Sequence, residues 1–394
     1  MGDWQVIIAG AGPVGLSAAL ALSRAGLRCL VLEAAEGIDL RMRASTFHPP
    51  TLDMLQALGV SGSLVAEGLQ SPVWQLRQHE SGRRVDFDLG VLAGDTAHPY
   101  RLQCEQHRLC RLIVDELDRR DDVAVHFSRA LAGFVADEDG ITVTTDDGDE
   151  VRGEWLIGAD GAGSRVRACL GLPYEGRTYE HASVLVTTDF PFEEHLDGLA
   201  NVAYCWSAQG PFSLLRLRDC WRVSLYPGAG DDLETLQKSD RLRPALARIH
   251  PDAGDARLLG VNPYRVQERC VPRFREGRVL LAGDAAHLNA PSGGMGMNGG
   301  IHDAMNLVEK LLRVIHGEPD DLLDRYSRQR RHLAAGAIIP QAAGNRLRMQ
   351  TRDPAEQQQR LARFEEIAKN EDRCRQFLLK SSMIAGLREA ERVS

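Results

Sequence analysis

Two acidic residues each follow a short apolar run and precede a glycine-rich turn. The second, Asp284, follows residues 279–282, which we predict to form a buried strand. A loop with Pro291 and glycines at 293, 294 and 296 comes next, and apolar residues then recur at three- and four-residue spacing over 301–315, which predicts a helix. A helix N-terminus attracts anions, and a carboxylate at a strand end can bind sugar hydroxyls. This stretch therefore suits a ligand with a polyol chain and a part that becomes anionic.

The first acidic residue, Asp160, lies in a similar arrangement. Residues 154–158 predict a buried strand, glycines stand at 161 and 163, and a helix is expected to open near Arg165. A strand-end turn without a ligand would give the same pattern. We favour a ligand site because the combination of apolar strand, acidic residue and glycine turn occurs twice in the chain.

The N-terminal segment carries a third glycine pattern. Residues 4–9 predict a buried strand, Gly10, Gly12 and Gly15 follow it, and a helix over 16–25 precedes a second strand, 29–32, that ends at Glu33. In a dinucleotide fold, the first glycine permits the tight turn, the second admits a pyrophosphate, and the third lets helix and strand pack. The acidic residue is placed to bind the adenosine ribose. The complete context makes a nucleotide site the preferred interpretation over a simple turn.

Composition and charge set further limits. The net charge of −8 does not suggest a nucleic-acid partner, and no run reaches the roughly 18 apolar residues of a membrane span. The N-terminus lacks the basic start of a signal peptide. The eight cysteines show no metal-ligand spacing, so no metal is predicted, and buried free thiols in the cytoplasm are expected.

The remaining pattern predicts an α/β chain with an inserted, mostly antiparallel sheet and a helical C-terminal segment. Residues 73–89 alternate as antiparallel strands do, and four strands are expected over 182–227, followed by a helix over 233–249. Residues 52–58 predict a helix capped by Thr51. Aromatic and basic residues of the inserted sheet could line a pocket for a flat substrate, although such residues more often pack in a core: Tyr204, Trp206, Arg216 and Tyr226.

Three motifs in order resemble the signatures of a known family. Residues 10–15 with Glu33, residues 158–167 and residues 282–298 are similar to those of the single-component FAD-dependent aromatic hydroxylases, the group A flavoprotein monooxygenases of the para-hydroxybenzoate hydroxylase type. The resemblance implies a Rossmann-like FAD-binding domain in three parts, a substrate domain in two parts, and the C-terminal helices. The expected boundaries are 1–72, 101–178 and 273–345 for FAD binding, 73–100 and 179–272 for the substrate domain, and 346–394 for the C-terminal segment.

By matching position, the resemblance implies roles for particular residues. The residues that would bind FAD are Gly10, Gly12, Gly15, Glu33, Arg43, Gln106, Asp160, Asp284, Gly296, Met297 and Asn298. Solvated surface is the simpler alternative for Arg43. Candidates for contact with substrate are Thr46, Tyr204 and Arg216, because an arginine-rich substrate cluster is not otherwise evident. Pro291 would lie beside the reacting face of the flavin, and His48 or Tyr204 could act on a substrate phenol, although a histidine beside two prolines is more often structural.

The implied activity is hydroxylation of a phenol-like or N-heteroaromatic small molecule with NADH or NADPH and O2, through a flavin C4a-hydroperoxide. A homodimer is a further expectation from the family. Two alternatives stay open at this point. One is another FAD-dependent oxidoreductase on the same scaffold, such as an epoxidase or a reductase. The other is a non-catalytic flavin-binding protein, which would bind FAD without consuming NAD(P)H.

Overall fold

The first of two large sheets is mainly parallel and carries the glycine-rich turn. The computed structural model of the chain describes residues 4–226 and 239–394. The parallel strands lie in the order β18 (Val279–Leu281), β11 (Glu150–Gly158), β1 (Trp4–Ala9), β2 (Cys29–Leu32) and β8 (Val123–His126). Antiparallel neighbours extend the sheet, namely β17 (Arg275–Glu276), β9 (Leu131–Ala136) and β10 (Ile141–Thr145). The carboxyl ends of β1, β11 and β18 therefore meet at one edge, which is where ligands bind in such folds.

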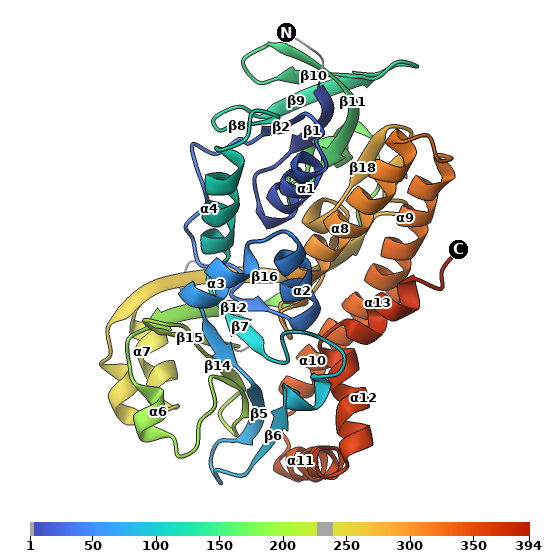
Figure 1. The fold of residues 1–394 in the computed structure, drawn as a ribbon. Helices are drawn as coiled ribbons and strands as arrows, with labels where there is room; N and C mark the ends of the chain where they lie inside the picture. Colours follow the sequence, from blue (N-terminus) through green and yellow to red (C-terminus); the bar gives the residue numbers. More distant parts are fainter. Residues whose placement is uncertain (1–3, 227–238) are drawn as a thin grey trace.

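Three helices pack side by side against this sheet (Figure 1): α1 (Pro13–Arg24), α4 (Gln106–Leu117) and α8 (Met295–Ile315). The strands β1 and β2 are buried almost throughout, and α1 buries ten of its twelve residues. Together they form the largest hydrophobic core of the molecule. This core holds the turn after β1 on a rigid base.

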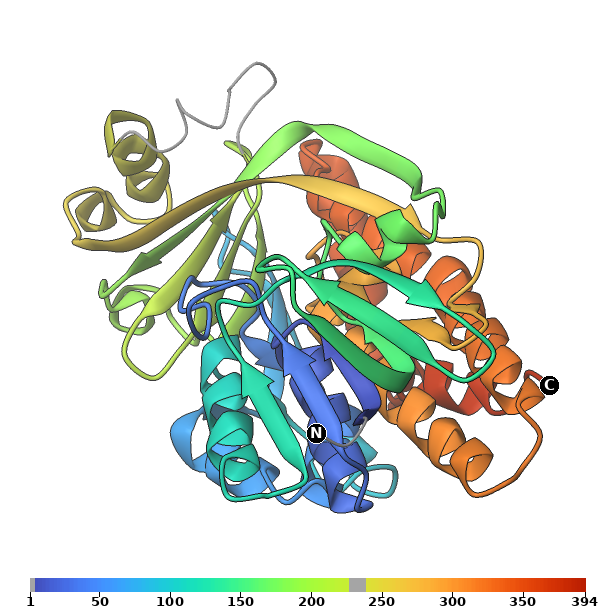
Figure 2. The same ribbon diagram turned by 90° about the horizontal axis from the view of Figure 1, so that it is seen from above.

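The second sheet is mostly antiparallel and packs beside the first unit. Its order is β19 (His287–Leu288), β16 (Leu258–Cys270), β12 (Glu175–Thr188), β15 (Trp221–Leu225), β14 (Phe212–Arg216), β13 (Val202–Trp206), β5 (Val73–Gln78) and β6 (Arg84–Asp88). Only the β13–β5 pair among these is parallel. The long strands β12 and β16 pair with each other and run from this sheet back towards the first one (Figure 2).

The two faces of the second sheet differ. Strand pairing places Trp221, Val223 and Leu214 on one face, where they pack with α6 (Phe192–His195) and α7 (Ser239–Ala247). We call this the outer face. The opposite, inner face bears Tyr204 and Arg222 and is turned towards the segment that leads into β3, because Arg222 donates to the Ser45 hydroxyl over 2.8 Å.

A small three-stranded sheet and several helices connect and buttress these units. The small sheet has the order β3 (Thr46–Phe47), β7 (Arg101–Gln103) and β4 (Leu69–Ser71), and α2 (Pro49–Ala57) and α3 (Ser61–Glu67) lie near it, with α5 (Arg165–Cys169) after β11. The C-terminal helices run along one side of the molecule, as Figure 1 shows. They are α9 (Asp321–Leu333), a π-helical turn (Ala334–Ile338), α10 (Ile339–Met349), α11 (Pro354–Lys369), α12 (Glu371–Ser381) and α13 (Ile384–Ala390).

The predicted fold class is confirmed, with a parallel α/β unit, a separate antiparallel sheet and a helical C-terminus. Helix starts were predicted less well than strands, and α1 begins at Pro13 rather than residue 16. Helix α8 begins at Met295 rather than residue 301, after Gly294 in the left-handed conformation with φ 67°. Helix α2 begins at Pro49, so Thr51 is not its cap; proline suits the first helical turn because the missing N–H has no partner there.

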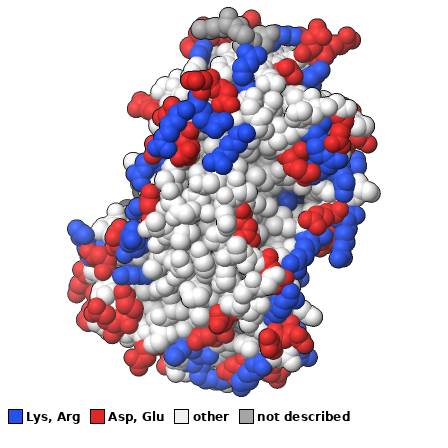
Figure 3. Space-filling view, in the orientation of Figure 1, with Lys and Arg blue, Asp and Glu red and all other residues white. Residues whose placement is uncertain are grey.

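Other expectations concern the middle of the chain and the surface. Of the helix expected over 233–249, residues 239–247 form α7, and 233–238 lie outside the described residues. All eight cysteines are free, and six are buried. None of the helices in the described ranges has the length and hydropathy needed to cross a bilayer. Basic and acidic side chains are intermixed on the face shown in Figure 3.

Candidate active site

Three glycines lie in and directly after the turn that follows β1, and the physical reason for a glycine differs at each position. Gly10 has φ 103°, and a Cβ there would lie 2.4 Å from the Ala159 carbonyl oxygen. A Cβ on Gly15 would lie 2.0 Å from the Gly10 oxygen, so this glycine permits close packing of α1 on the turn. Gly12 has an extended backbone (φ −76°, ψ 178°), and a Cβ there would meet no protein atom within 4 Å. Neither backbone strain nor packing requires a glycine at position 12, so an external ligand is the remaining physical reason for it.

The two acidic strand-end residues near this turn hold backbone N–H groups. Glu33 accepts from the N–H of Ala11 over 2.7 Å and from the N–H of Ala35 over 2.9 Å, which links the end of β2 to the turn. Asp160 accepts from the backbone N–H of Arg165 over 2.6 Å and of Val166 over 3.0 Å. The second motif packs directly on the first, since Asp160 lies against Gly10.

Asp284 lies in the short turn after β18 with an exposed side chain. The surrounding protein raises the pKa of its carboxyl, Asp303 adds to that rise, and His287 and Arg43 oppose it. The positive charge of Arg43 therefore acts on the Asp284 carboxylate. Gln106 begins α4, and its backbone N–H donates to the Ala44 oxygen, which brings it beside the same segment. The fold therefore gathers these predicted residues along one edge.

A buried ionic cluster binds the residues on either side of Asp284 and fixes the turn that carries it. Asp303 is fully buried in α8 and accepts from the backbone N–H of Gly283 over 2.9 Å, from His287 Nε2 over 2.8 Å and from Arg330 Nε. Burial alone would raise the pKa of Asp303, but Arg330 and His287 lower it to about 2. This cluster was not predicted from the sequence. The available signal was an acidic residue between Ile301 and Ala304, which both belong to the apolar stripe.

The start of α8 is fixed by Asn298. Its amide nitrogen donates to the carbonyl oxygens of Thr46 over 2.8 Å and Gly294 over 2.6 Å, and its amide oxygen accepts from the His48 N–H over 2.8 Å. Asn298 is completely buried, so its side chain joins the segment of Thr46 and His48 to the helix start instead of facing a ligand. Met297 is buried as well, whereas the first backbone N–H groups of the helix have no partner within it.

The His48 side chain also has a structural role. It is completely buried, and its Nε2 lies 2.8 Å from the Gly293 oxygen. Because the partner is a carbonyl, Nε2 must carry the proton. Burial, reinforced by Arg101, lowers the pKa of His48 to about 3, against the Gly293 bond. A histidine with this pKa is a weak base near neutral pH, and its observed contact fixes the loop that carries Pro291.

The inner face of the second sheet lies opposite this loop region. Tyr204, Arg222, Tyr226 and Tyr264 share it by strand pairing, and the charge of Arg222 acts on Tyr226 and Tyr264. Enclosure in protein lowers the pKa of the Arg222 guanidinium, with the three tyrosines opposing. Its Nε has no partner, and within residues 4–226 and 239–394 no carboxylate forms an ion pair with it. We call this group the tyrosine–arginine face.

The structure does not bring every predicted substrate residue to this face. Arg216 pairs with Trp221 across the strands, so it points to the outer face, where it lies 3.1 Å from Glu193 and stacks over Trp221. The prediction that Arg216 contacts substrate conflicts with this placement. The Thr46 hydroxyl donates to Gln103 over 2.9 Å and is buried, whereas Pro291 is exposed at the loop. Strand register, which decides the face, was not readable from the local sequence.

These features fit a flavin dinucleotide. The space beside Gly12 admits a pyrophosphate, the exposed Asp284 carboxylate suits sugar hydroxyls, and the start of α8 offers free N–H groups to an anionic ring. The FAD binding domain family matches residues 3–339. The chain is 32% identical over 394 residues to para-nitrophenol 4-monooxygenase of Pseudomonas sp. strain WBC-3, covering 98% of this chain and 97% of the relative. The chain belongs to the FAD-dependent aromatic monooxygenases.

One more relative by sequence and two solved structures are also similar to this chain. It is 32% identical over 357 residues to 6-hydroxy-3-succinoylpyridine 3-monooxygenase of Pseudomonas putida strain S16, covering 89% of this chain and 90% of the relative. The crystal structure of p-nitrophenol 4-monooxygenase from Pseudomonas putida DLL-E4 superposes with a TM-score of 0.90 at 32% identity, over 96% of this chain and 97% of that one. Aklavinone-11 hydroxylase, solved with FAD and aklavinone, is 26% identical with a TM-score of 0.78, over 89% and 70% of the two chains.

Proposed function

We propose that this monooxygenase hydroxylates a phenol-like or N-heteroaromatic ring bound between the Pro291 loop and the tyrosine–arginine face. The observation that supports the proposal most directly is the placement of Arg222 and its tyrosines opposite the segment that carries Pro291 and the start of α8. The relatives named above act on para-nitrophenol and on a hydroxypyridine, which are flat rings with an acidic hydroxyl. Such a ring would stack against tyrosines and present its oxygen to cationic groups.

The cofactor would lie along the edge of the first sheet. In this proposal Gly12 admits the pyrophosphate, Glu33 contacts the adenosine ribose, and Asp284 binds the ribityl hydroxyls. The neighbouring residues Gly10, Gly15, Arg43, Gln106 and Asp160 shape or line the same edge. FAD supplies the transfer of electrons from NADH or NADPH and the activation of O2 when it is bound.

The protein contributes charge stabilisation at the start of α8. The backbone N–H groups of Met295, Gly296 and Met297 are the first of the helix and have no intrahelical acceptor. With the helix dipole, they would stabilise negative charge on the pyrimidine side of a reduced flavin. Asn298 contributes indirectly, because its three hydrogen bonds fix the direction of this helix start.

A second contribution is activation of the substrate hydroxyl. Loss of its proton makes a phenol ring more electron-rich, and positive charge nearby favours the deprotonated form. Arg222 supplies such a charge, and Arg101 Nη1 lies 3.5 Å from the Tyr204 hydroxyl. We assign contact with the substrate oxygen to Tyr204 and electrostatic support to the two arginines. His48 holds the Pro291 loop in this scheme instead of acting as the base.

Anaerobic reduction of the flavin by NADH and by NADPH tests the function. The absorbance of oxidised flavin is followed with the holoenzyme alone and with phenols, nitrophenols, hydroxybenzoates and hydroxypyridines. We expect one class to accelerate reduction and, in air, to yield a product with one added oxygen atom. NAD(P)H consumption that no aromatic stimulates, together with no oxygenated product, would contradict the proposal.

A further inference from the structure

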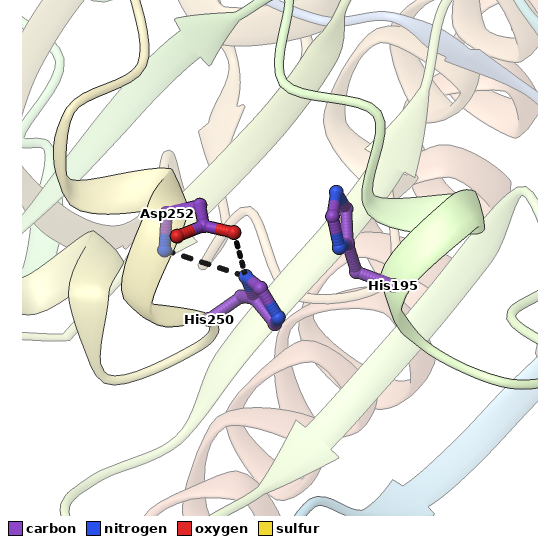
Figure 4. A group of neighbouring side chains, drawn as sticks. All are labelled: His195, His250 and Asp252. Carbon is purple, nitrogen blue, oxygen red and sulfur yellow. Dashed lines mark hydrogen bonds and ion pairs between the residues drawn. The ribbon is translucent and has the colours of Figure 1, made fainter.

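A cluster of metal-binding side chains lies on the outer layer of the second sheet. His195 ends the short helix α6, while His250 and Asp252 lie at a 3-10 turn (Pro251–Gly254) after α7 (Figure 4). Each side chain offers one ligand atom, and these atoms lie within 4.8 Å of one another. The two segments are 55 residues apart in the sequence, so the fold brings them together. The cluster is on the opposite side of the sheet from the tyrosine–arginine face.

Two of the ligand atoms face each other as hydrogen-bond acceptors. His250 Nδ1 accepts from the Asp252 backbone N–H over 3.4 Å, so this nitrogen carries a lone pair. The same atom lies 3.8 Å from a carboxylate oxygen of Asp252. The hydrogen bond to Nδ1 is long, so a metal ion could take this lone pair in place of the N–H, and the carboxylate oxygen lies near enough to bind the same ion.

The third ligand is held in place by ring stacking. The His195 ring stacks on Phe190 with centroids 4.8 Å apart and an interplanar angle of 18°, and its centroid is 4.3 Å from that of His250. Phe190 is 7% exposed, which anchors this stack in the core of the outer layer. Helix α6 is fixed further, because Trp221 Nε1 donates to Glu193 over 2.6 Å. His195 is therefore directed towards the other two ligands by packing.

We propose that His195, His250 and Asp252 form a binding site for a divalent transition metal, with Zn2+ the best match. Two imidazoles and one carboxylate are a ligand set that zinc accepts, with a fourth position left for water. Zinc–ligand distances of about 2.1 Å place tetrahedral ligand atoms roughly 3.4 Å apart, so the present atoms would close by at most about 1.4 Å. The exposed His195 and Asp252 side chains have room for this rotation.

The bound ion would join α6 to the turn after α7. Both segments cover the hydrophobic core of the outer face, which includes Phe192, Trp221 and Leu246. A ligand that binds only the folded state raises stability in proportion to the logarithm of its concentration over Kd. The ion would thus stabilise the contact between α6 and this turn on the outer face of the second sheet, on the opposite side from the tyrosine–arginine face.

Zinc binding to the FAD-loaded enzyme tests the site, with any affinity tag removed. Isothermal titration with ZnCl2 and thermal unfolding with and without zinc are measured for wild type, His195→Ala, His250→Ala and His316→Ala. The last is the matched control, because His316 is exposed at the C-cap of α8 and its side chain bonds to the Leu312 carbonyl of that helix. Flavin content and hydroxylation rate verify that each variant is folded.

We expect one zinc per chain at micromolar concentration and a rise in the unfolding temperature with zinc. His195→Ala and His250→Ala should each weaken binding at least tenfold and abolish the rise, while His316→Ala behaves as wild type. The proposal is overturned if zinc does not bind at 100 µM. It is also overturned if the two variants bind zinc as tightly as wild type. Either result leaves the hydroxylase proposal intact, because that proposal is tested by substrate-dependent flavin reduction.

Discussion

Replacement of Gly12 by valine separates ligand binding from folding. Gly12 has backbone angles that any residue adopts, and a Cβ there would meet no protein atom within 4 Å. The protein alone therefore tolerates a side chain at this position. If a pyrophosphate lies beside the Gly12 backbone, the same side chain occupies the space that the phosphates need. We expect Gly12→Val to fold normally and to lose FAD.

The expected changes in the free energy of unfolding and in the Kd for FAD can be worked out from the geometry. Gly12 is the N-cap of α1 without a side-chain bond, so its replacement should change the free energy of unfolding of the flavin-free protein by less than about 1 kcal/mol. Hydrogen bonds to a charged partner contribute about 1.5–3 kcal/mol each. Loss of two such bonds to phosphate would raise the Kd for FAD by roughly 10²–10⁴-fold, because every 1.4 kcal/mol is a factor of ten.

Gly15→Ala is the matched comparison on the same helix. A Cβ at Gly15 would lie 2.0 Å from the Gly10 oxygen, which is a backbone atom that moves only with the turn. Overpacking of this kind typically costs 1–3 kcal/mol. Gly15→Ala should therefore reduce the stability of the flavin-free protein, whereas Gly12→Val should not.

The assay combines FAD titration, followed by flavin fluorescence, with urea unfolding of flavin-free protein. The reasoning is refuted if Gly12→Val binds FAD within threefold of wild type. It is also refuted if Gly12→Val loses FAD only in proportion to a large loss of stability, since the glycine would then be required by the fold. Equal stability of the two variants would contradict the packing role of Gly15.

Three further substitutions test other parts of the site. Asp284→Ala should weaken FAD binding at least tenfold without changing urea unfolding by more than about 1 kcal/mol, and unchanged flavin content would count against its assignment. Asp303→Asn should destabilise the protein by about 3 kcal/mol at pH 7, because it leaves Arg330 buried without its charge partner. The pKa of Asp303 is lowered to about 2 from 3.8, so the ionic contribution is complete above pH 4 and lost as pH falls towards 2; a stability difference from wild type that is undiminished at pH 2 would oppose this account. Arg222→Met should lower kcat/KM for the accepted phenol at least tenfold with full flavin content, while Arg216→Met on the outer face changes it less than threefold; equal effects would contradict the assignment of faces.

Local sequence patterns were sufficient for the parts of the fold that depend on neighbouring residues. Strands β1 and β2 and the turn between β1 and α1 follow from apolar runs and glycine spacing, and the structure has them at the predicted positions. The same holds for β5 and β6, although only β6 alternates between buried and exposed residues, and β5 is buried on both faces. Periodicity identifies such elements because each residue's burial is set by its own strand or helix.

The side of a strand that faces the site is set by partners distant in sequence. Arg216 and Arg222 lie on adjacent strands, and the sequence pattern singled out Arg216 and not Arg222. The pairing of Leu215 with Arg222, and of Arg216 with Trp221, sends the two arginines to opposite faces. A slip of one residue in the register of β15 alone would place both arginines on the same face. Local pattern therefore predicts the sheet but not which arginine lies on the inner face.

Helix α8 explains why the site was only partly predicted. Its apolar stripe identified residues 301–315, but the first turn contains glycines and Asn298, which favour other structures locally. Long-range bonds stabilise that turn: Asn298 binds the segments of Thr46 and His48, and Asp303 binds Gly283. Both side chains are completely buried, so each polar interruption of the buried face marks a contact with another segment. The helix start that faces the predicted flavin edge is thus held by the same residues that interrupt the hydrophobic pattern, through hydrogen bonds to the β3–α2 segment and to the Asp284 turn.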